Sequence, residues 1–392
     1  MREDPEMKKT IAVLGATGSV GTQALDVARS RGYEIDFLSA NRDSVSLEKY
    51  AREFGVQTVA MADESAARDL SVRLSDTNIR VLYGEEGIRE GIAKSSSETV
   101  VNSILGEAGL IPSLSVIDSG KRLALANKES LVIAGDIVMS RARERAVEII
   151  PVDSEHSAIF QSMKSGRTSE VKRLILTASG GPFFGYSKEQ LRRVTLDDAL
   201  AHPTWKMGRK ITVDSATLMN KGFEIIEAAH LFGIPADKIL VTVHRESILH
   251  SAVEYIDNSI IGEFSVPDMR MCVQYAVDYP KRCESTSRPL DLFKVGALSF
   301  SQPDREAFPF LDLAVRAMKL GGACPAVMNA LDEVAVAAFL GGRLSFVGIF
   351  ESVMETFERF THAKDAHTLE DIISYDREAR RAIEEYLNKK TQ

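Results

Sequence analysis

The residues from His202 to Glu227, HPTWKMGRKITVDSATLMNKGFEIIE, are dense in groups that can do chemistry. They include the single tryptophan of the sequence and a run of hydroxyl and amide side chains that ends in the cation Lys221. Two carboxylates three residues apart, Glu224 and Glu227, follow in a segment with helical character. Hydroxyl, amide and ammonium groups bind anions, and a nearby carboxylate can ligate a metal or transfer a proton. The stretch therefore predicts an anion site followed by a metal or acid/base ligand.

A second pair of carboxylates, Asp153 and Glu155, follows the apolar run VEIIPV at 147–152. If strand geometry continues by one step, both side chains point to the same face. They then repel each other unless a proton or a cation lies between them, and a hard divalent ion suits oxygen ligands. The same residues also fit a helix start, with Asp153 or Ser154 as the N-cap and Glu155 in the first turn. A third carboxylate would decide between the two interpretations, and Glu224 is the candidate.

A glycine-rich turn lies near the N-terminus. The apolar run TIAVL (10–14) leads into GATGSVG (15–21), and a helix-like stretch continues to Gly32. A strand, a glycine turn and a helix in this order can hold a dinucleotide pyrophosphate at the helix N-terminus. The spacing is G-x-x-G-x-x-G instead of the commoner G-x-G-x-x-G, and a plain tight turn is the alternative interpretation.

Two cations at predicted strand ends are further candidates. After the second strand (34–39) comes Ala40-Asn41-Arg42-Asp43, where an NAD enzyme usually has an acidic residue for the ribose. Arg42 can pair with a 2′-phosphate, which favours NADP, or it can be a solvated surface arginine beside Asp43. Lys128, in LALANKESLV (123–132), can grip cofactor or substrate, or be a surface lysine near a helix start.

Composition sets the broad class. A chain of 392 residues predicts two or three domains, and 44% hydrophobic with 27% charged residues is typical of a globular enzyme. A net charge of -8 argues against nucleic acid as the main partner. The three cysteines are far apart, which predicts a reducing compartment with no disulfide framework and no structural zinc. With no membrane span and no signal peptide in view, we expect a cytoplasmic protein.

The pattern of apolar runs predicts the organisation of the chain. Short runs alternate with amphipathic stretches up to about residue 150, as a doubly wound parallel sheet requires. The strand VKRLILTA (171–178) ends at SGGPF, and a long polar loop up to Ala201 then delivers His202, Trp205 and Met207 as a lid. The alternating runs SAVEYI (251–256) and SIIGEF (259–264) predict a β-hairpin with a free edge that can serve as a dimer surface. The predicted parts are an α/β cofactor-binding domain at 1–149, a central α/β domain at 150–277, a proline-rich linker at 278–309 and a helical domain at 310–392.

The motifs together resemble one family. GATGSVG, LANKESLV, VDSEH, SGGPF, HPTWKMGRK, VDSATLMNKGFE and PDMR (267–270) occur in the order and at the spacing of 1-deoxy-D-xylulose 5-phosphate reductoisomerases of the non-mevalonate isoprenoid pathway. The resemblance implies a Rossmann-like NADPH-binding domain, a central catalytic domain with a mixed sheet, a C-terminal helical domain and a homodimer. It also implies a ketose phosphate substrate, rearranged by a retro-aldol/aldol route and reduced by NADPH to 2-C-methyl-D-erythritol 4-phosphate. The metal would be Mg²⁺ or Mn²⁺, with Co²⁺ as a further option.

The resemblance also implies roles for individual residues. The metal ligands would be Asp153, Glu155 and Glu224. Helix spacing places Glu227 one turn beyond Glu224, which favours a supporting group over a ligand. Lys128 and Ser154 would contact the oxygen-bearing carbons of the substrate, and Trp205 and Met207 would belong to a closing flap. The phosphate would be held by Ser179, His202, Ser215, Asn220 and Lys221. The NADPH contacts would be Gly15, Thr17, Gly18, Ser19, Val20, Gly21, Asn41, Arg42, Asn127, Lys128, Glu129, Gly208 and Met269.

Two departures and two rival classes remain. Asn41-Arg42 stands where a Gly-Lys pair is common in the family, and Arg245-Glu246 stands where a Pro-Gln pair is common. The first rival is another two-domain NADP oxidoreductase that needs no metal. The second is a regulatory protein that senses the cofactor without catalysis, although such a sensor has no evident use for three carboxylates.

Overall fold

The computed structural model describes residues 9–201 and 208–390, which fall into two compact units. Unit 1 contains the residues up to Ser130 together with Val138–Ser157 and Asp268–Arg288. Unit 2 contains Leu131–Ile137, Ala158–Pro267 and the residues from Pro289 onward. The predicted four-part division of the chain stays a prediction.

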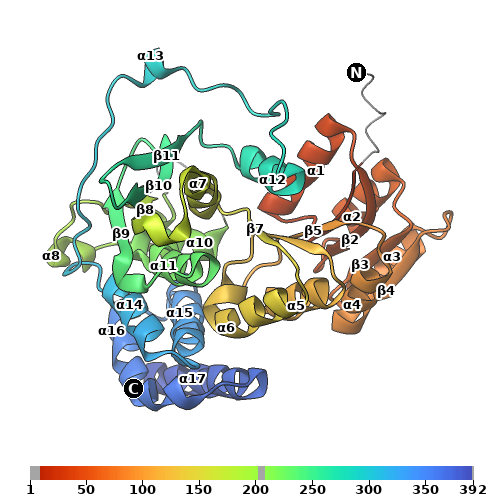
Figure 1. Ribbon diagram of the computed structural model, residues 1–392. Helices are drawn as coiled ribbons and strands as arrows, with labels where there is room; N and C mark the ends of the chain where they lie inside the picture. The colour runs from red at the N-terminus through yellow and green to blue at the C-terminus, as the bar shows by residue number, and fades with distance from the viewer. Residues whose placement is uncertain (1–8, 202–207, 391–392) are drawn as a thin grey trace. The chain divides into compact units, whose positions relative to one another are not determined.

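Unit 1 is built on a parallel sheet of seven strands in the order β4-β3-β2-β1-β5-β6-β7 (Figure 1). The strands are β1 (Thr10–Leu14), β2 (Glu34–Ala40), β3 (Thr58–Met61), β4 (Arg80–Tyr83), β5 (Thr99–Asn102), β6 (Arg122–Leu125) and β7 (Ile149–Pro151). The strand order reverses at β1, which pairs with β2 on one side and β5 on the other. Ligands of open α/β sheets bind at the carboxyl ends of the strands beside such a reversal. The predicted parallel sheet is thereby confirmed.

The helices that contribute to unit 1 are α1 (Ser19–Arg31), α2 (Ser44–Phe54), α3 (Glu64–Arg73), α4 (Gly84–Lys94), α5 (Leu110–Asp118), α6 (Glu129–Glu144), α7 (Ser154–Ser162) and α12 (Met269–Asp278), with a 3₁₀ turn at Glu107–Gly109. Helices α1 to α6 connect the strands because amphipathic stretches must bury their apolar faces on the sheet, α7 follows β7, and α12 comes from later in the chain. Helices α6 and α7 contribute residues to both units.

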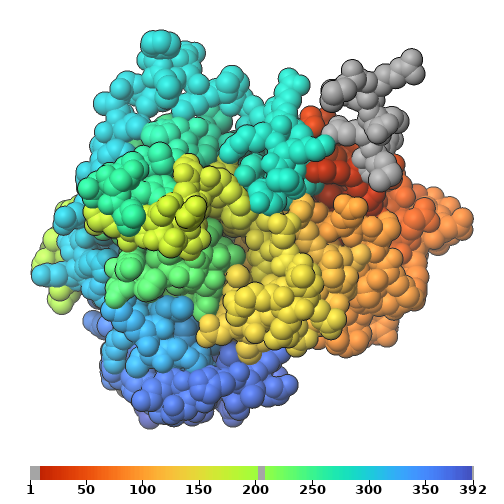
Figure 2. All heavy atoms as spheres, in the orientation of Figure 1, coloured from red at the N-terminus to blue at the C-terminus, as the bar shows by residue number. Residues whose placement is uncertain are grey.

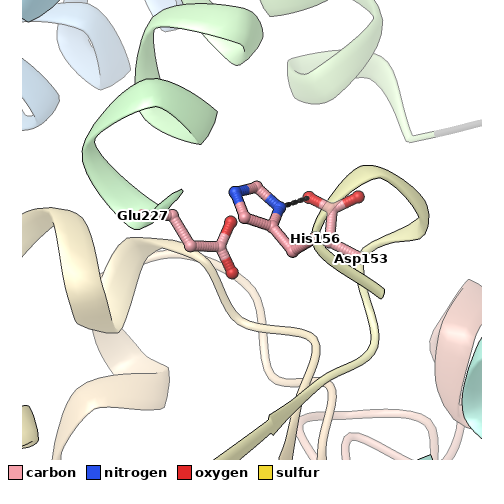
Figure 3. A group of neighbouring side chains, drawn as sticks. All are labelled: Asp153, His156 and Glu227. Carbon is pink, nitrogen blue, oxygen red and sulfur yellow. Dashed lines mark ion pairs between the residues drawn. The ribbon is translucent and has the colours of Figure 1, made fainter. Parts of the chain in front are cut away.

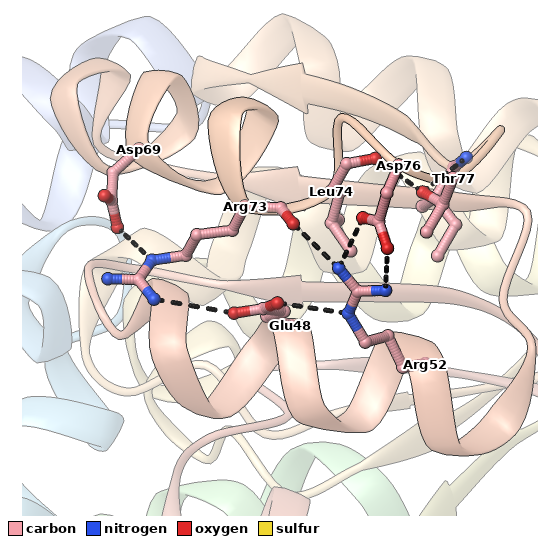
Figure 4. Close-up of polar contacts among 8 residues, drawn as sticks. Glu48, Arg52, Asp69, Arg73, Leu74, Asp76 and Thr77 are labelled. Carbon is pink, nitrogen blue, oxygen red and sulfur yellow. Dashed lines mark hydrogen bonds and ion pairs between the residues drawn. The ribbon is translucent and has the colours of Figure 1, made fainter.

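The outer helices α2 and α3 are joined by a chain of ion pairs (Figure 4). Arg73 on α3 pairs with Glu48 on α2 at 3.5 Å and with Asp69 at 2.6 Å, and Arg52 on α2 pairs with Glu48 at 3.0 Å and with Asp76, beyond the end of α3, at 2.7 Å. Most of these side chains are exposed to solvent, so each pair contributes little to stability. The network orients two surface helices and takes no part in the candidate site.

Residues 268–288 return to unit 1 from far along the chain. Asp278, at the end of α12, accepts hydrogen bonds from the Lys9 ammonium at 2.9 Å and the Tyr33 hydroxyl at 2.7 Å. Burial opposes ionisation of Asp278, but these two donors outweigh it and lower the pKa of its carboxyl. Arg122 also donates to the Tyr279 carbonyl at 2.8 Å. The returning segment is therefore held by Lys9 and Tyr33, near the start of the chain, and by Arg122 at the start of β6.

Unit 2 contains a mixed sheet of four strands in the order β11-β10-β8-β9. The strands are β8 (Val171–Ala178), β9 (Ile239–Val243), β10 (Leu249–Tyr255) and β11 (Ile260–Phe264). β10 and β11 form the predicted antiparallel hairpin, and β8 runs parallel to β9. β11 is an edge strand of this sheet.

The helices of unit 2 precede, separate and follow these strands. They are α8 (Lys188–Leu191), α9 (Leu196–Leu200), α10 (Arg209–Thr217), α11 (Met219–Phe232), α13 (Leu292–Val295), α14 (Phe310–Leu320), α15 (Cys324–Leu340), α16 (Phe346–Phe357) and α17 (Leu369–Lys390), with 3₁₀ turns at Met163–Ser165, Thr168–Glu170, Ala236–Lys238 and Glu358–Asp365. In α14–α17 the Phe346 ring meets the Phe350 ring edge-on, with centroids 5.6 Å apart. No helix within residues 9–201 and 208–390 is long and apolar enough to cross a membrane.

The segment 179–201 is more ordered than the predicted polar loop. It contains α8 and α9, and both begin with a capping box. Ser187 caps α8 with Gln190, and Thr195 caps α9 with Asp198. The sequence prediction was wrong here because such short helices depend on their caps and not on apolar periodicity.

The extended segment after Pro289 lies at the surface (Figure 2) and is fastened to the end of β9. Ser301 exchanges two backbone hydrogen bonds with Val243. Glu246 lies 3.0 Å from Nδ1 of the buried His244 and accepts a hydrogen bond from the Ser299 hydroxyl at 2.7 Å. The Arg245 guanidinium lies over the Phe184 ring, 5.3 Å from its centroid. The structure thus gives Glu246, which had no explanation in the sequence, a role in fastening this segment, whereas Arg245 contacts the turn after β8.

Candidate active site

The glycine turn follows β1 directly and needs its glycines. Gly15 has a φ of +76°, and a Cβ there would lie 2.8 Å from the Ser103 carbonyl oxygen. A Cβ on Gly21 would lie 2.2 Å from the Gly15 carbonyl oxygen, so the first turn of α1 folds tightly over the strand end. Thr17 and Gly18 are half-buried and Ser19 is exposed. The first N–H groups of α1 therefore face a compact turn of the kind that binds a pyrophosphate.

The carboxyl end of β2 presents an exposed cation. The Arg42 side chain is 79% exposed and pairs with Asp63 at 3.1 Å. Asp43 caps α2 by accepting a hydrogen bond from the Ser46 backbone N–H at 3.0 Å. Its bonds to Ser46 lower the pKa of the Asp43 carboxyl. An exposed ion pair is weak, so a 2′-phosphate can replace Asp63 as the partner of Arg42 at little cost.

At the end of β6, Asn127 and Lys128 have different functions. Asn127 is buried and donates to the Ile104 and Gly106 carbonyls at 2.7 and 2.9 Å, while its Oδ1 accepts from the Ser130 backbone N–H. It therefore holds the loop and the start of α6 in place. Lys128 is 9% exposed, and its ammonium lies 2.5 Å from Asp153 Oδ2. The interpretation of Lys128 as a surface lysine is wrong, because the side chain is buried against a carboxylate.

The strand β7 ends at Pro151, and the chain turns into helix α7 at Ser154. The strand geometry does not continue through Asp153 and Glu155, so the alternative interpretation as a helix start is the one observed. The Ser157 backbone N–H donates to the Asp153 carbonyl at 2.8 Å. The helical turn still brings carboxylate oxygens of Asp153 and Glu155 within 4.8 Å of each other.

Two neighbours complete this acidic turn. The Ser154 hydroxyl donates to Glu155 Oε2 at 2.5 Å. The fully buried His156 lies with Nδ1 3.8 Å from Asp153 Oδ2 (Figure 3). The sequence prediction gave His156 no role, although its position three residues after Asp153 on a helix would have indicated the contact. Carboxylate oxygens this close repel each other unless a proton or a cation lies between them, and a hard divalent ion suits oxygen ligands.

In unit 2 the turn after β8 packs directly on α10. Gly180 and Gly181 have φ values of +78° and +63°, and a Cβ on Gly181 would lie 2.7 Å from the Ser215 carbonyl oxygen. The Gly181 N–H donates to the Ser179 hydroxyl at 3.3 Å. The structure therefore brings the segments of Ser179 and Ser215 together, as a shared anion site requires.

The sharp turn between α10 and α11 places the remaining polar groups. Leu218 joins the two helices with a φ of +61°, and Asn220 and Lys221 lie in the first turn of α11. Asn220 donates to Glu224 Oε1 at 2.6 Å, and Lys221 forms an ion pair with Glu224 Oε2. Lys221 and Glu224 are 4% and 1% exposed. Because water cannot solvate these buried charges, each is stabilised by the other and by any charged ligand that binds beside them.

The other predicted positions are distributed as follows. Glu227 is fully buried on α11, one turn beyond Glu224 (Figure 3). Gly208 is exposed at the start of α10, and Met269 is half-buried at the start of α12. His202, Trp205 and Met207 lie outside the described residues, and the lid prediction for them stays a prediction.

A parallel sheet with a glycine turn at its strand reversal, an exposed cation after the second strand and an acidic turn three strands away are typical of a metal-dependent NADP oxidoreductase. Three family models match the chain: 1-deoxy-D-xylulose 5-phosphate reductoisomerase over residues 11–135, its C-terminal domain over 149–232, and a second DXP reductoisomerase C-terminal domain over 264–382. The chain belongs to the 1-deoxy-D-xylulose 5-phosphate reductoisomerase family.

Relatives support this assignment along the whole chain. The sequence is 50% identical over 380 residues to the enzyme of Caldanaerobacter subterraneus, covering 96% of this chain and 98% of the relative. It is 51% identical over 379 residues to that of Acetivibrio thermocellus, covering 97% and 99%. The structure of the Zymomonas mobilis enzyme with NADPH has a TM-score of 0.91 at 41% identity, covering 97% and 99%. A reductoisomerase in complex with NADPH, fosmidomycin and magnesium also has a TM-score of 0.91, at 36% identity, covering 98% and 99%.

Proposed function

We infer that this chain converts 1-deoxy-D-xylulose 5-phosphate to 2-C-methyl-D-erythritol 4-phosphate, using NADPH and a divalent metal ion. The observation that carries this conclusion is the 50% identity to a reductoisomerase over 96% of the chain. The solved relatives hold NADPH and magnesium, and the glycine turn and the acidic turn are suited to those two groups. The reaction belongs to non-mevalonate isoprenoid precursor synthesis.

We propose Asp153, Glu155 and Glu224 as the metal ligands, because all three offer carboxylate oxygens in buried or half-buried positions. When bound, a divalent cation polarises hydroxyl and carbonyl oxygens of the ketose phosphate. Lys128, held by Asp153 at 2.5 Å, keeps a positive charge at the same place and can orient a substrate oxygen. Ser154 fixes the rotamer of Glu155 by its hydrogen bond. These residues bind and orient the reacting carbons.

The phosphate end of the substrate is proposed to lie at Ser179, Ser215, Asn220 and Lys221, with His202 as a further ligand. Support comes from the packing of the Gly180-Gly181 turn on α10 and from the burial of the Lys221 ammonium. A phosphate gripped away from the reacting carbons supplies binding energy that can position those carbons. The cofactor contacts proposed from the resemblance, including Asn41, Glu129 and Met269, complete the assignment, with Asn127 acting through the loop that it holds.

The decisive assay measures NADPH oxidation with 1-deoxy-D-xylulose 5-phosphate, with and without a chelator. We expect substrate-dependent oxidation that a chelator abolishes and added Mg²⁺ or Mn²⁺ restores. Activity that persists after complete chelation would favour the metal-independent oxidoreductase class. No oxidation under any condition, with intact NADPH binding, would favour the cofactor sensor.

We further propose that the chain is a homodimer through the β11 edge. Ile260, Ile261 and Phe264 are 58%, 38% and 47% exposed on this edge strand, and unpaired apolar edges tend to pair with another strand. Sedimentation is expected to give the mass of two 43.1 kDa chains, and Phe264→Lys is expected to shift the equilibrium toward monomer. A wild-type chain that sediments as a monomer at every concentration would contradict this.

We also propose a cytoplasmic location. Cys272, Cys283 and Cys324, which all fall in the described part of the chain, are free thiols, as a reducing compartment favours. Fractionation of cells that produce the chain tests this location directly.

A further inference from the structure

We propose that Lys210, Asp214 and Asp332 form a buried bracket through which the C-terminal helix α15 positions the phosphate site on α10 and α11. This inference deepens the proposed function, since it rests on Ser215, Asn220 and Lys221 binding the substrate phosphate. It gives the C-terminal helices a role in substrate binding beyond packing.

The bracket is centred on the Lys210 ammonium. Its Nζ lies 2.7 Å from Asp214 Oδ2 on α10 and 2.9 Å from Asp332 Oδ2 on α15. It also lies 4.9 Å from the centroid of the Phe223 ring on α11, within the range of a cation–π contact. One cation therefore connects three helices of unit 2.

Burial makes these contacts specific. Asp214 and Asp332 are 2% and 0% exposed, so water cannot take the place of Lys210 as their partner. If the Lys210 ammonium were removed, each carboxyl would lose a buried ion-pair partner. Burial raises the pKa of the Asp332 carboxyl, and the Lys210 ammonium acts in the opposite direction. An amide at position 332 can keep the hydrogen-bonding oxygen without the cost of a buried charge.

The bracket adds polar contacts to a short helix that is otherwise held by apolar packing, with Val213 and Ala216 fully buried. α10 is nine residues long and begins after Gly208, which has no side chain to cap it. Its C-terminal end passes into the strained turn at Leu218. A helix this short depends on tertiary contacts for its place.

The bracket residues adjoin the proposed phosphate ligands in the chain. Asp214 directly precedes Ser215, whose carbonyl lies against the Gly181 turn. Phe223 directly precedes Glu224, which pairs with Lys221. If α10 shifted relative to α15, the Ser215 segment and the Ser179 segment packed on it would both be displaced. The turn that carries Asn220 would be displaced as well. We assign Lys210, Asp214 and Asp332 as positioning residues.

The test compares full-length variants in which only the bracket is altered. Lys210→Met keeps the aliphatic stem and removes the ammonium, and Asp332→Leu removes the acceptor on α15. Asp332→Asn is the conservative variant. Asp376→Asn is the matched control, because Asp376 is a buried carboxyl of α17 that pairs with Arg380 at 2.7 Å within the same helical region. Lys221→Ala gives the reference value for direct loss of a phosphate ligand.

Three quantities are measured: the KM and kcat for 1-deoxy-D-xylulose 5-phosphate, the Kd of inorganic phosphate by titration calorimetry, and the Tm. For Lys210→Met and Asp332→Leu we expect KM and the phosphate Kd to rise together by about tenfold, because small displacements of binding groups weaken oriented contacts strongly. Asp332→Asn should stay within about threefold of the wild type, since its amide oxygen still accepts from Lys210. Asp376→Asn should lower the Tm while the phosphate Kd stays unchanged.

Two results would overturn the inference. One is a lowered Tm with unchanged KM and phosphate Kd in both Lys210→Met and Asp332→Leu, which would make the bracket merely structural. The other is an equal rise of the phosphate Kd in Asp376→Asn, which would make the effect one of general destabilisation. If the wild type shows no turnover, the proposed function fails instead, and the phosphate Kd values still report on the bracket.

Discussion

Glu224→Gln is expected to lower turnover by about 10³-fold or more, because a lost metal contact removes several kcal/mol of transition-state stabilisation. Glu224 is 1% exposed and already accepts from Asn220 and Lys221. A glutamine occupies the same volume and keeps one acceptor oxygen, but it removes the charge that a divalent ion requires. The effect should therefore appear in catalysis and metal binding and not in folding.

The measurement pairs steady-state kinetics with NADPH binding by fluorescence titration. NADPH affinity should stay within about twofold of the wild type, since Glu224 belongs to unit 2 and the glycine turn to unit 1. Asp136→Asn is a suitable control, because Asp136 is an 89% exposed carboxylate on α6 and should leave turnover unchanged. Near-normal turnover in Glu224→Gln would remove this residue from the proposed metal site.

Gly21→Ala is expected to weaken NADPH binding by at least about tenfold, equivalent to roughly 1.4 kcal/mol. The added Cβ would lie 2.2 Å from the Gly15 carbonyl oxygen and 2.8 Å from the Ala16 Cα. Both neighbours are backbone atoms, so the strain cannot be relieved by a rotamer change. The turn must open, and the N–H groups that face the pyrophosphate lose their alignment.

Gly91→Ala provides the matched control within the same unit. Its Cβ would lie 2.1 Å from the Phe37 ring, which is buried in the core under α4. Overpacking of this kind costs about 1–3 kcal/mol of stability. We expect Gly91→Ala to lower the Tm and to leave the NADPH Kd unchanged. If both alanine variants weaken NADPH binding equally, the cause is a general loss of folding and not a local distortion of the glycine turn.

The sequence allowed the parallel sheet, the glycine turn and the hairpin to be predicted because each depends on local patterns. TIAVL followed by GATGSVG specifies a strand, a turn and a helix within two dozen residues. The acidic turn was ambiguous, because Asp153 and Ser154 suit a strand end as well as a helix start. Tertiary packing decides between these possibilities, and the structure shows a helix from Ser154.

Other features depend on contacts between residues far apart in the chain, which no local pattern records. Lys210 and Asp332 are 122 residues apart. The sequence around each of them does not distinguish it from a charged residue on the surface. The same holds for Glu246, which binds Ser299 across 53 residues. The capped helices α8 and α9 were missed for a different reason, since four or five residues are too few to show a period.

The return of residues 268–288 to unit 1 has a consequence for synthesis of the chain. Tyr33 and Lys9 bind Asp278 across 245 and 269 residues, so these contacts cannot form until well over half of the polypeptide has been made. Until then the face of α1 that packs against α12 has no cover, and exposed apolar surface favours aggregation. The nucleotide-binding end of the chain is thus translated first but completed late, and the closing of such long loops is a slow step in folding. Nascent chains that end before Asp268 should therefore depend on chaperones more than the finished protein does.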